Sequence, residues 1–251
     1  MGIDYAVERG IATITLDNQD NRNALSRALV DAVGSHLSTA AGDDAVRAVV
    51  LTHTGRTFCA GADLKEQAAE GGPAEGTRRM LALLRSIVEL PKPVIARIDG
   101  HVRAGGVGLV GACDLALAGS LATFAFTEVR LGLAPAIISL TTLPRMTARA
   151  VSRYYLTGES FGADIAADIG LVTTATENLD GELGAVCDAL RACSPQGLAE
   201  TKPLTTAAAR AAFAAGADDM QALSQRLFES EEAREGIRSF LEKRPPRWAD
   251  T

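Results

Sequence analysis

The stretch PVIARIDGHVRAGGVGLVGACDLALA, residues 93–118, decides the fold class of this chain. Residues 93–98 are mostly apolar and predict a strand, with a proline allowed at its start. A glycine-rich turn follows, and residues 105–112 predict a short apolar helix. Residues 114–118 predict the next strand. Strand, helix and strand in this order indicate an α/β fold, in which loops that follow strands and open helices build functional sites.

The segments on either side extend this alternation. Residues 3–7 and 11–16 alternate apolar and polar around a turn, which predicts a β-hairpin. Ser26 is a candidate N-cap for a helix that runs to about Thr39. The remaining expected elements are a buried strand at 48–52, a glycine-rich loop at 54–63, a helix at about 75–90, a strand at 122–126, mostly helices from about 136, and a strand-like segment at 171–174. An α/β core therefore precedes a helical C-terminal portion.

Composition excludes several classes of protein. The 251 residues are 47% hydrophobic and 22% charged, which is typical of a globular protein rather than a disordered one. The net charge of −6 and the lack of a basic block argue against binding to nucleic acid or an anionic membrane. Four cysteines without CxxC spacing predict neither a disulfide framework nor a zinc site. No long apolar run or secretory signal is present, so we expect a cytoplasmic protein.

The segment 106–111 matches the dinucleotide-binding pattern GxGxxG. Seven residues separate the predicted strand at 93–98 from its first glycine, which is too long for a tight phosphate-binding turn. Asp114 lies at the start of the next strand, whereas a ribose-binding acid belongs at its end. Packing of a helix through small residues therefore explains the glycines better than a nucleotide site does.

The segment FCAGADLKE, residues 58–66, breaks from a strand into small residues and then starts a helical turn. Small side chains allow a ligand carbonyl to approach backbone N–H groups, and a helix N-terminus carries unpaired N–H groups and a favourable dipole. The helix that opens near Gly105 offers the same features. Two such ends facing one pocket would form an oxyanion hole. A tight turn without a ligand is the alternative.

Glu128 follows the apolar strand at 122–126 and precedes further apolar residues. A carboxyl group in such surroundings has a raised pKa, which suits acid–base catalysis. The alternative is a surface acid paired with Arg130. His101 is interpreted as a structural imidazole and Cys59 as a packing residue, and no His/Asp/Glu cluster has metal-ligand spacing.

Together, and in this order, the segments NRNALS, FCAGADLKE, DGHVRAGGVGLVGACDLALA, ATFAFTEVRLGLAPA, YYLTGESFGADIAADIGLV and EGIRSFLEKR resemble the enoyl-CoA hydratase/isomerase (crotonase) family across essentially the whole chain. The resemblance implies a spiral core of repeated ββα units over residues 1–195. It also implies a helical trimerisation region over residues 196–251. Members form homotrimers, often dimers of trimers.

The resemblance also implies the site. The oxyanion-hole amides are those of Ala62 and Gly105, and Glu128 is the acid–base carboxylate. Contacts to coenzyme A (CoA) fall on the loop after the hairpin and on residues 58–66, here called the oxyanion segment. The residues are Arg22, Ala24, Ala60, Ala62, Asp63, Leu64 and Lys65. Phe240 and Lys243 in the tail match residues that reach a neighbour's CoA. CoA is part of the substrate, and neither a further cofactor nor a metal is implied.

One departure concerns Gly108, because family hydratases carry a first glutamate at that position. We expect an enoyl-CoA hydratase in fatty acid or leucine degradation, and the alternatives are a Δ3,Δ2-enoyl-CoA isomerase that uses Glu128 alone or a CoA-ester-binding paralogue without hydratase activity. The segments GGVGLVGACD and FTEVRLGLAPAIIS look like a bacterial branch with 3-methylglutaconyl-CoA hydratase-like members, where glycine also occurs. We expect the glycine to leave room for a bulky acyl group or a water molecule. An NAD-dependent dehydrogenase is the remaining class.

Overall fold

The computed structural model describes residues 2–69 and 73–250, and two sheets organise them. The larger sheet has the strand order β1-β2-β3-β5-β7-β10, and only its β1–β2 hairpin is antiparallel. The smaller sheet has the order β4-β6-β8-β9. The strands span Ile3–Glu8 (β1), Ile11–Leu16 (β2), Ala48–His53 (β3), Thr57–Cys59 (β4), Val94–Ile98 (β5), His101–Arg103 (β6), Leu115–Ala118 (β7), Thr123–Ala125 (β8), Phe161–Gly162 (β9) and Thr174–Ala175 (β10).

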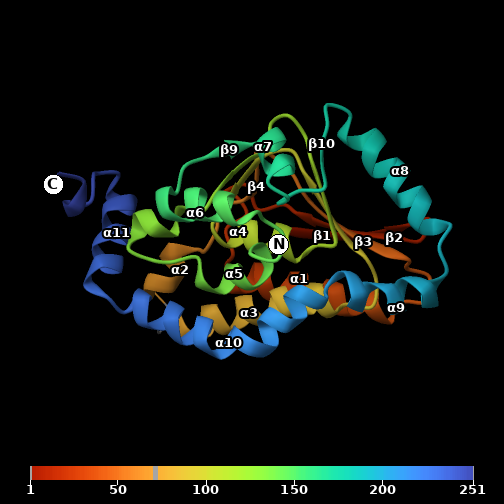
Figure 1. The fold of residues 1–251 in the computed structure, drawn as a ribbon, viewed down its shortest axis with the longest axis horizontal. Helices are drawn as coiled ribbons and strands as arrows, with labels where there is room; N and C mark the ends of the chain where they lie inside the picture. Colours follow the sequence, from red (N-terminus) through yellow and green to blue (C-terminus); the bar gives the residue numbers. More distant parts are fainter. Residues whose placement is uncertain (1, 70–72, 251) are drawn as a thin grey trace.

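A repeated unit links the two sheets. Strands β3, β5 and β7 each lie in the larger sheet, and the strand that follows each of them, β4, β6 or β8, lies in the smaller one. Each pair then leads into helical structure, which confirms the expected ββα repetition (Figure 1). The helices are α1 (Arg27–Gly42), α2 (Leu64–Ala69), α3 (Pro73–Glu89), α4 (Gly105–Ala112), η1 (Thr127–Leu131), α5 (Ala136–Thr142), α6 (Ala148–Thr157), α7 (Ala163–Asp168), α8 (Leu179–Arg191), α9 (Pro195–Thr205), α10 (Ala207–Phe228), α11 (Glu231–Glu242) and η2 (Arg247–Asp250).

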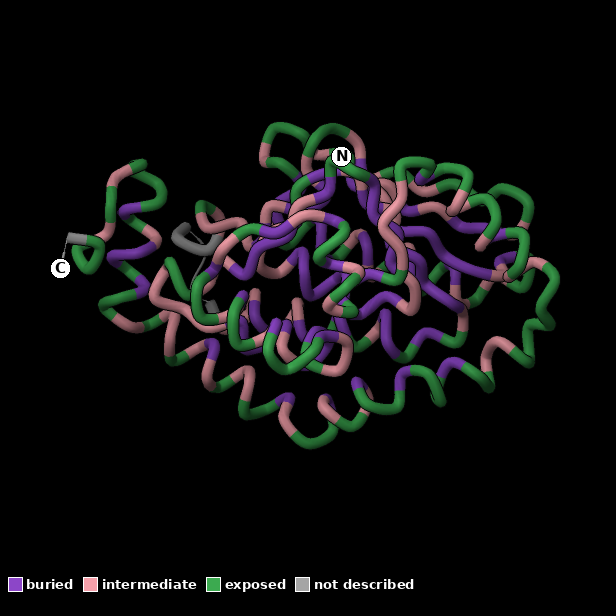
Figure 2. The backbone as a smooth tube through the Cα atoms, turned by 45° about the horizontal axis from the view of Figure 1, so that its top comes forward, coloured by how far each residue is buried: buried purple, intermediate pink, exposed green. Residues whose placement is uncertain are grey.

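The two faces of the larger sheet are buried against different helices. Val49 and Leu51 of β3 belong to the main apolar cluster, together with residues of α1, α3 and α10. Ala48 and Val50, which alternate with them, pack in a second cluster with residues of α8. A strand buried on both faces needs apolar residues throughout, which explains why the sequence of β3 shows no polar alternation. Figure 2 shows the buried chain concentrated along these central strands.

Several predicted elements are confirmed, and three differ. The loop predicted at 54–63 contains strand β4, and the turn predicted after residue 98 contains strand β6. Ser26 caps α1 by accepting a hydrogen bond from the Leu29 amide at 3.3 Å. The predicted strand at 171–174 is displaced, because only Thr174 and Ala175 pair in the sheet. The amides of Leu171 and Val172 donate instead to the Ala166 carbonyl, at 2.9 and 3.1 Å. Their side chains are buried like those of a strand, but their N–H groups are not available to a ladder.

The C-terminal helices pack on this core. Helix α10 lies against α3 and α5, and it contributes Ala209, Phe213 and Ala217 to the main apolar cluster (Figure 1). The predicted boundary after residue 195 falls at the first residue of α9 and stays a prediction. Within the described residues, no helix combines the length and apolar character needed to cross a membrane.

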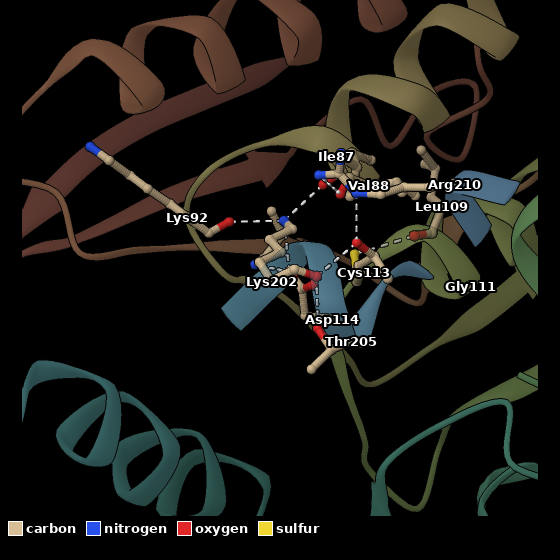
Figure 3. Close-up of polar contacts among 12 residues, drawn as sticks. Ile87, Val88, Lys92, Leu109, Gly111, Cys113, Asp114, Lys202, Thr205 and Arg210 are labelled. Carbon is tan, nitrogen blue, oxygen red and sulfur yellow. Dashed lines mark hydrogen bonds and ion pairs between the residues drawn. The ribbon is translucent and has the colours of Figure 1, made fainter. Parts of the chain in front are cut away.

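A buried ion pair fastens α9 to the core. The ammonium group of Lys202 lies 2.8 Å from Asp114 Oδ2, and it also donates to the carbonyls of Ile87 and Lys92 at 2.8 and 2.9 Å (Figure 3). Asp114 Oδ2 accepts the Val94 amide at 2.7 Å. One side chain of α9 therefore joins the end of α3, the start of β5 and the start of β7.

Candidate active site

A cavity of about 640 Å³ opens beside the smaller sheet. The first residues of α2, α4 and α5 line it, together with η1 and residues of α10 and α11. Ten of the predicted site residues border this one cavity: Arg22, Ala24, Ala60, Ala62, Asp63, Leu64, Lys65, Gly105, Glu128 and Phe240. Lys243 does not line it. Its predicted contact is with a neighbour's CoA, and that stays a prediction.

The loop between β2 and α1 is held in an unusual conformation. Arg22 and Asn23 both have left-handed backbones, with φ of 57° and 53°. The Asn23 side chain fixes the loop, since its Oδ1 accepts the Asn18 amide at 2.7 Å and its Nδ2 donates to the Thr57 carbonyl at 2.8 Å. Asparagine tolerates this conformation better than most residues do. The loop is thereby attached to β4, where the oxyanion segment begins.

The oxyanion segment follows β4 directly and contacts this loop through its backbone. The Ala60 amide donates to the Arg22 carbonyl at 3.1 Å, and the Leu25 amide donates to the Gly61 carbonyl at 2.8 Å. Asp63 then caps α2, because its Oδ1 accepts the amides of Lys65 and Glu66 at 3.1 Å each. The predicted helical start at the acidic residue is confirmed.

Glycines allow the second segment, residues 104–106 at the start of α4, to pack against the oxyanion segment, residues 58–66. A Cβ atom on Gly61 would lie 3.0 Å from Ala104 Cβ, and one on Gly106 would lie 2.7 Å from Cys59 Cβ. Ala104 has φ of 47° and ψ of −118°, a strained backbone for a residue with a side chain. It lies immediately before Gly105, whose amide begins α4. The close approach of the two segments therefore depends on glycine at positions 61 and 106 and on the strained backbone of Ala104.

The amides of Ala62 and Gly105 are available to a ligand. Across residues 2–69 and 73–250, neither N–H group donates to a protein acceptor. Both residues line the cavity. Unpaired donors at a cavity wall are the arrangement that stabilises an oxygen atom gaining negative charge.

Glu128 lies on η1, at the end of β8. Its Oε2 atom is buried and has no hydrogen-bond partner in the described part of the chain. Burial raises the pKa of this carboxyl group to about 7, and a backbone hydrogen bond opposes the shift. The alternative of a surface acid paired with Arg130 is wrong, because the Arg130 guanidinium donates to the Thr157 carbonyl at 3.3 Å.

The expectation that Gly108 leaves room for an acyl group or a water molecule is wrong. A Cβ atom on Gly108 would lie 2.4 Å from Cγ2 and 2.8 Å from Cβ of Ile138. The Ile138 side chain therefore occupies the space above the glycine, and Ile138 itself lines the cavity. No sequence pattern joins two positions thirty residues apart on different helices, so this residue was not among the predicted ones.

The remaining sequence interpretations concern packing. Gly111 lies under α5, since a Cβ there would be 2.9 Å from the Thr141 carbonyl oxygen, so the GxGxxG glycines serve close helix packing. Burial raises the pKa of the Cys59 thiol to about 12, which agrees with a packing residue. His101 Nδ1 lies 2.8 Å from Thr123 Oγ1, outside the cavity. No three His, Cys, Asp or Glu residues of the described chain gather closely enough to hold a metal ion.

Sequence reasoning also missed most of the apolar wall. Residues from η1, the start of α5, α10 and α11 contribute it: Leu131, Leu133, Ala134, Pro135, Ala136, Ile137, Ile138, Phe228 and Leu241. Arg130 adds a basic residue to the lining beyond the predicted Arg22 and Lys65. The cavity thus combines an apolar wall with cationic side chains, which suits a ligand with a hydrocarbon part and an anionic part.

Comparisons with known proteins agree with this arrangement. A family model described as enoyl-CoA hydratase/isomerase matches residues 6–251. A solved enoyl-CoA hydratase from Mycobacterium avium is 53% identical, with a TM-score of 0.91 and 98% of each chain covered. A Rhodobacter capsulatus protein named "Probable enoyl-CoA hydratase" is 37% identical over 97% of this chain and 96% of its own. An enoyl-CoA isomerase/hydratase from Mycosarcoma maydis is 31% identical over 94% of this chain and 92% of its own.

Proposed function

The chain belongs to the enoyl-CoA hydratase/isomerase (crotonase) family and has its fold, and we propose that it hydrates the α,β double bond of an enoyl-CoA thioester. The observation that supports this proposal is the convergence of three groups on one cavity. The free amides of Ala62 and Gly105 and the buried carboxyl group of Glu128 all border it.

In the proposed reaction, the thioester oxygen accepts hydrogen bonds from the amides of Ala62 and Gly105. The Glu128 carboxylate removes a proton from water while the water oxygen bonds to the β-carbon. The π electrons move toward the thioester oxygen and give an enolate. The carboxyl group then returns the proton to the α-carbon, so water is added and Glu128 is restored. A positioned acid–base group contributes about 10²–10⁴ in rate, and one oxyanion donor about 10²–10³.

The protonation of Glu128 suits this role. With a pKa of about 7, both the carboxylate and the carboxylic acid are populated near neutral pH. The reaction uses the two forms in turn, because the group first accepts and then donates one proton. A carboxyl group with its ordinary pKa would be a weaker base and would hold the returned proton less well.

A Δ3,Δ2-enoyl-CoA isomerase is the second candidate, and Ile138 favours it. Because Ile138 fills the space above Gly108, a hydrocarbon side chain stands where a first glutamate would lie. Isomerisation needs only one base, which removes a proton from the α-carbon and returns it to the γ-carbon. Glu128 alone suffices for that proton shuttle.

Binding of the CoA moiety is proposed at the cationic side of the cavity. Arg22 and Lys65 supply charge for its phosphates, and Asp63 and Leu64 supply the neighbouring wall. Phe240 is 56% exposed at the rim, and we propose that it and Lys243 reach the CoA of a neighbouring subunit in a homotrimer or a dimer of trimers. No separate cofactor is proposed, and we expect the enzyme in the cytoplasm.

The proposal is tested by incubating the protein with crotonyl-CoA, a long-chain 2-enoyl-CoA, 3-methylglutaconyl-CoA and a 3-enoyl-CoA. Loss of enoyl thioester absorbance with formation of the 3-hydroxy product supports the hydratase. A gain of conjugation from the 3-enoyl-CoA without hydration supports the isomerase instead. Glu128→Gln should lower either rate about 10²–10⁴-fold. Tight binding without turnover on every acyl-CoA would contradict both reactions.

A further inference from the structure

Helix α4 carries Gly105 at one end and is held at the other end by a residue outside the helix. The eight residues of α4 include no basic side chain in the last turn. Arg145, in the loop between α5 and α6, donates from Nε to the Gly111 carbonyl at 3.3 Å and from Nη2 to the Cys113 carbonyl at 3.0 Å. A guanidinium at a helix C-terminus also interacts favourably with the helix dipole.

The residue that follows the helix pairs two of its other terminal carbonyls. The Cys113 amide donates to the carbonyls of Leu109 and Val110 at 3.2 Å each, and the Cys113 thiol donates to Leu109 at 3.2 Å (Figure 3). Arg145 binds the carbonyls of Gly111 and Cys113, which have no partner within the helix because the last carbonyls of a helix lack intrahelical donors. Arg145 therefore completes the C-terminal end of α4.

The interface between α4 and α5 leaves little freedom for sliding. Gly108 packs directly on Ile138, and Gly111 lies against the backbone of Thr141. The Thr141 hydroxyl donates to the Gly108 carbonyl at 3.0 Å. Since Gly108 and Gly111 have no side chains at this contact, a shift of α4 along its axis would bring its backbone against α5.

These contacts connect the two halves of the site. Eight helical residues span about 12 Å, so α4 links the Arg145 contacts at its C-terminus to the Gly105 amide at its N-terminus. Arg145 follows α5, and α5 follows η1, which carries Glu128. The guanidinium therefore ties the helix that presents the amide to the chain segment that presents the carboxyl group.

We propose that Arg145 is a positioning residue, which sets the place of the Gly105 amide relative to Glu128 by holding the C-terminal end of α4. The inference rests on the proposed function, since it assigns the Gly105 amide to the substrate carbonyl. Arg145 does not line the cavity, so its proposed effect on the substrate passes through α4.

The test compares Arg145→Met with Arg145→Lys in the full-length protein. Arg145→Met keeps length and loses both hydrogen bonds, and we expect kcat to fall about tenfold with KM changed less than about twofold, a smaller loss than the 10²–10³ of a missing donor. Arg145→Lys keeps the charge and one donor group, and it should recover part of the loss. The second readout is the absorbance of bound cinnamoyl-CoA, whose shift to longer wavelength measures polarisation of the thioester carbonyl and should shrink in Arg145→Met.

Lys92→Met is the matched control, because Lys92 donates to the carbonyls of Ala40 and Asp43 at the end of α1, away from the cavity. It should lower the melting temperature and leave kcat and the absorbance shift unchanged. A normal shift and normal kcat in Arg145→Met would overturn the positioning role. Absence of any shift and any turnover in the wild-type protein would overturn the proposed function, and this inference with it.

Discussion

The oxyanion region and the acid–base region of this cavity are built in opposite ways. In the proposed reaction, main-chain amides at Ala62 and Gly105 supply the chemistry of the first, and small residues allow the two segments to meet. In the same proposal a single side chain, Glu128, supplies the chemistry of the second, and burial raises its pKa. The first region should therefore be sensitive to added volume, whereas the second should be sensitive to charge and pH.

The largest effect expected from volume alone is at Gly106. In Gly106→Ala the new Cβ would meet Cys59 Cβ at 2.7 Å and the Cys59 carbonyl oxygen at 3.1 Å, so the two amide segments must separate. We expect kcat on an accepted enoyl-CoA to fall about 10–10²-fold, toward the loss of one oxyanion donor.

Gly34→Ala in α1 is the control for this change, because a Cβ there meets nothing within 4 Å. Its rate should equal that of the wild-type protein. Equal rates for Gly106→Ala and Gly34→Ala would show that close approach of the two segments does not matter for catalysis.

The next effect concerns the stability contributed by Glu128. Its folded-state pKa, about 7, lies above the ordinary value of 4.5, so burial disfavours the charged form. The stability that the uncharged Glu128 carboxyl group contributes should therefore be complete below about pH 4.5 and be lost as pH rises through 7. The loss is of order 3 kcal/mol at most.

Urea unfolding of the wild-type protein and Glu128→Gln at pH 5 and pH 8.5 measures this difference, since glutamine does not titrate. The variant should gain stability relative to the wild type as pH rises. A stability difference that is the same at both pH values would show that the Glu128 carboxyl group is not buried in an uncharged form.

The smallest effect is expected at Ile138, which lines the cavity that both regions border. Ile138→Ala would open space above Gly108, and kcat/KM for a branched enoyl-CoA should rise about tenfold relative to an unbranched one, as for one or two methylene groups in an apolar pocket. The measurement is competition between the two substrates. Ile137→Ala is the control, because Ile137 lines the cavity without covering Gly108. An unchanged ratio of kcat/KM between the two substrates in Ile138→Ala would show that Ile138 does not determine acyl selectivity.

Much of the site was predictable because its residues lie in local motifs. The segment 58–66 indicates small residues before a helix start, and Asp63 caps α2 as that pattern predicts. The apolar residues before Glu128 predict a raised pKa, which the buried carboxyl group has. The smaller sheet was not predictable as a sheet, because β4, β6 and β8 have three residues each and show no periodicity.

The sequence by itself determined the order of motifs, the α/β core, the family resemblance and the ten predicted residues that border the cavity. These features depend on neighbours within a few positions along the chain. Only the tertiary structure decided that Ile138 covers Gly108 and that Arg145 completes the end of α4. Both contacts join residues about thirty positions apart through close helix packing, and the free energy of such contacts depends on the distance between backbones, which no local pattern encodes.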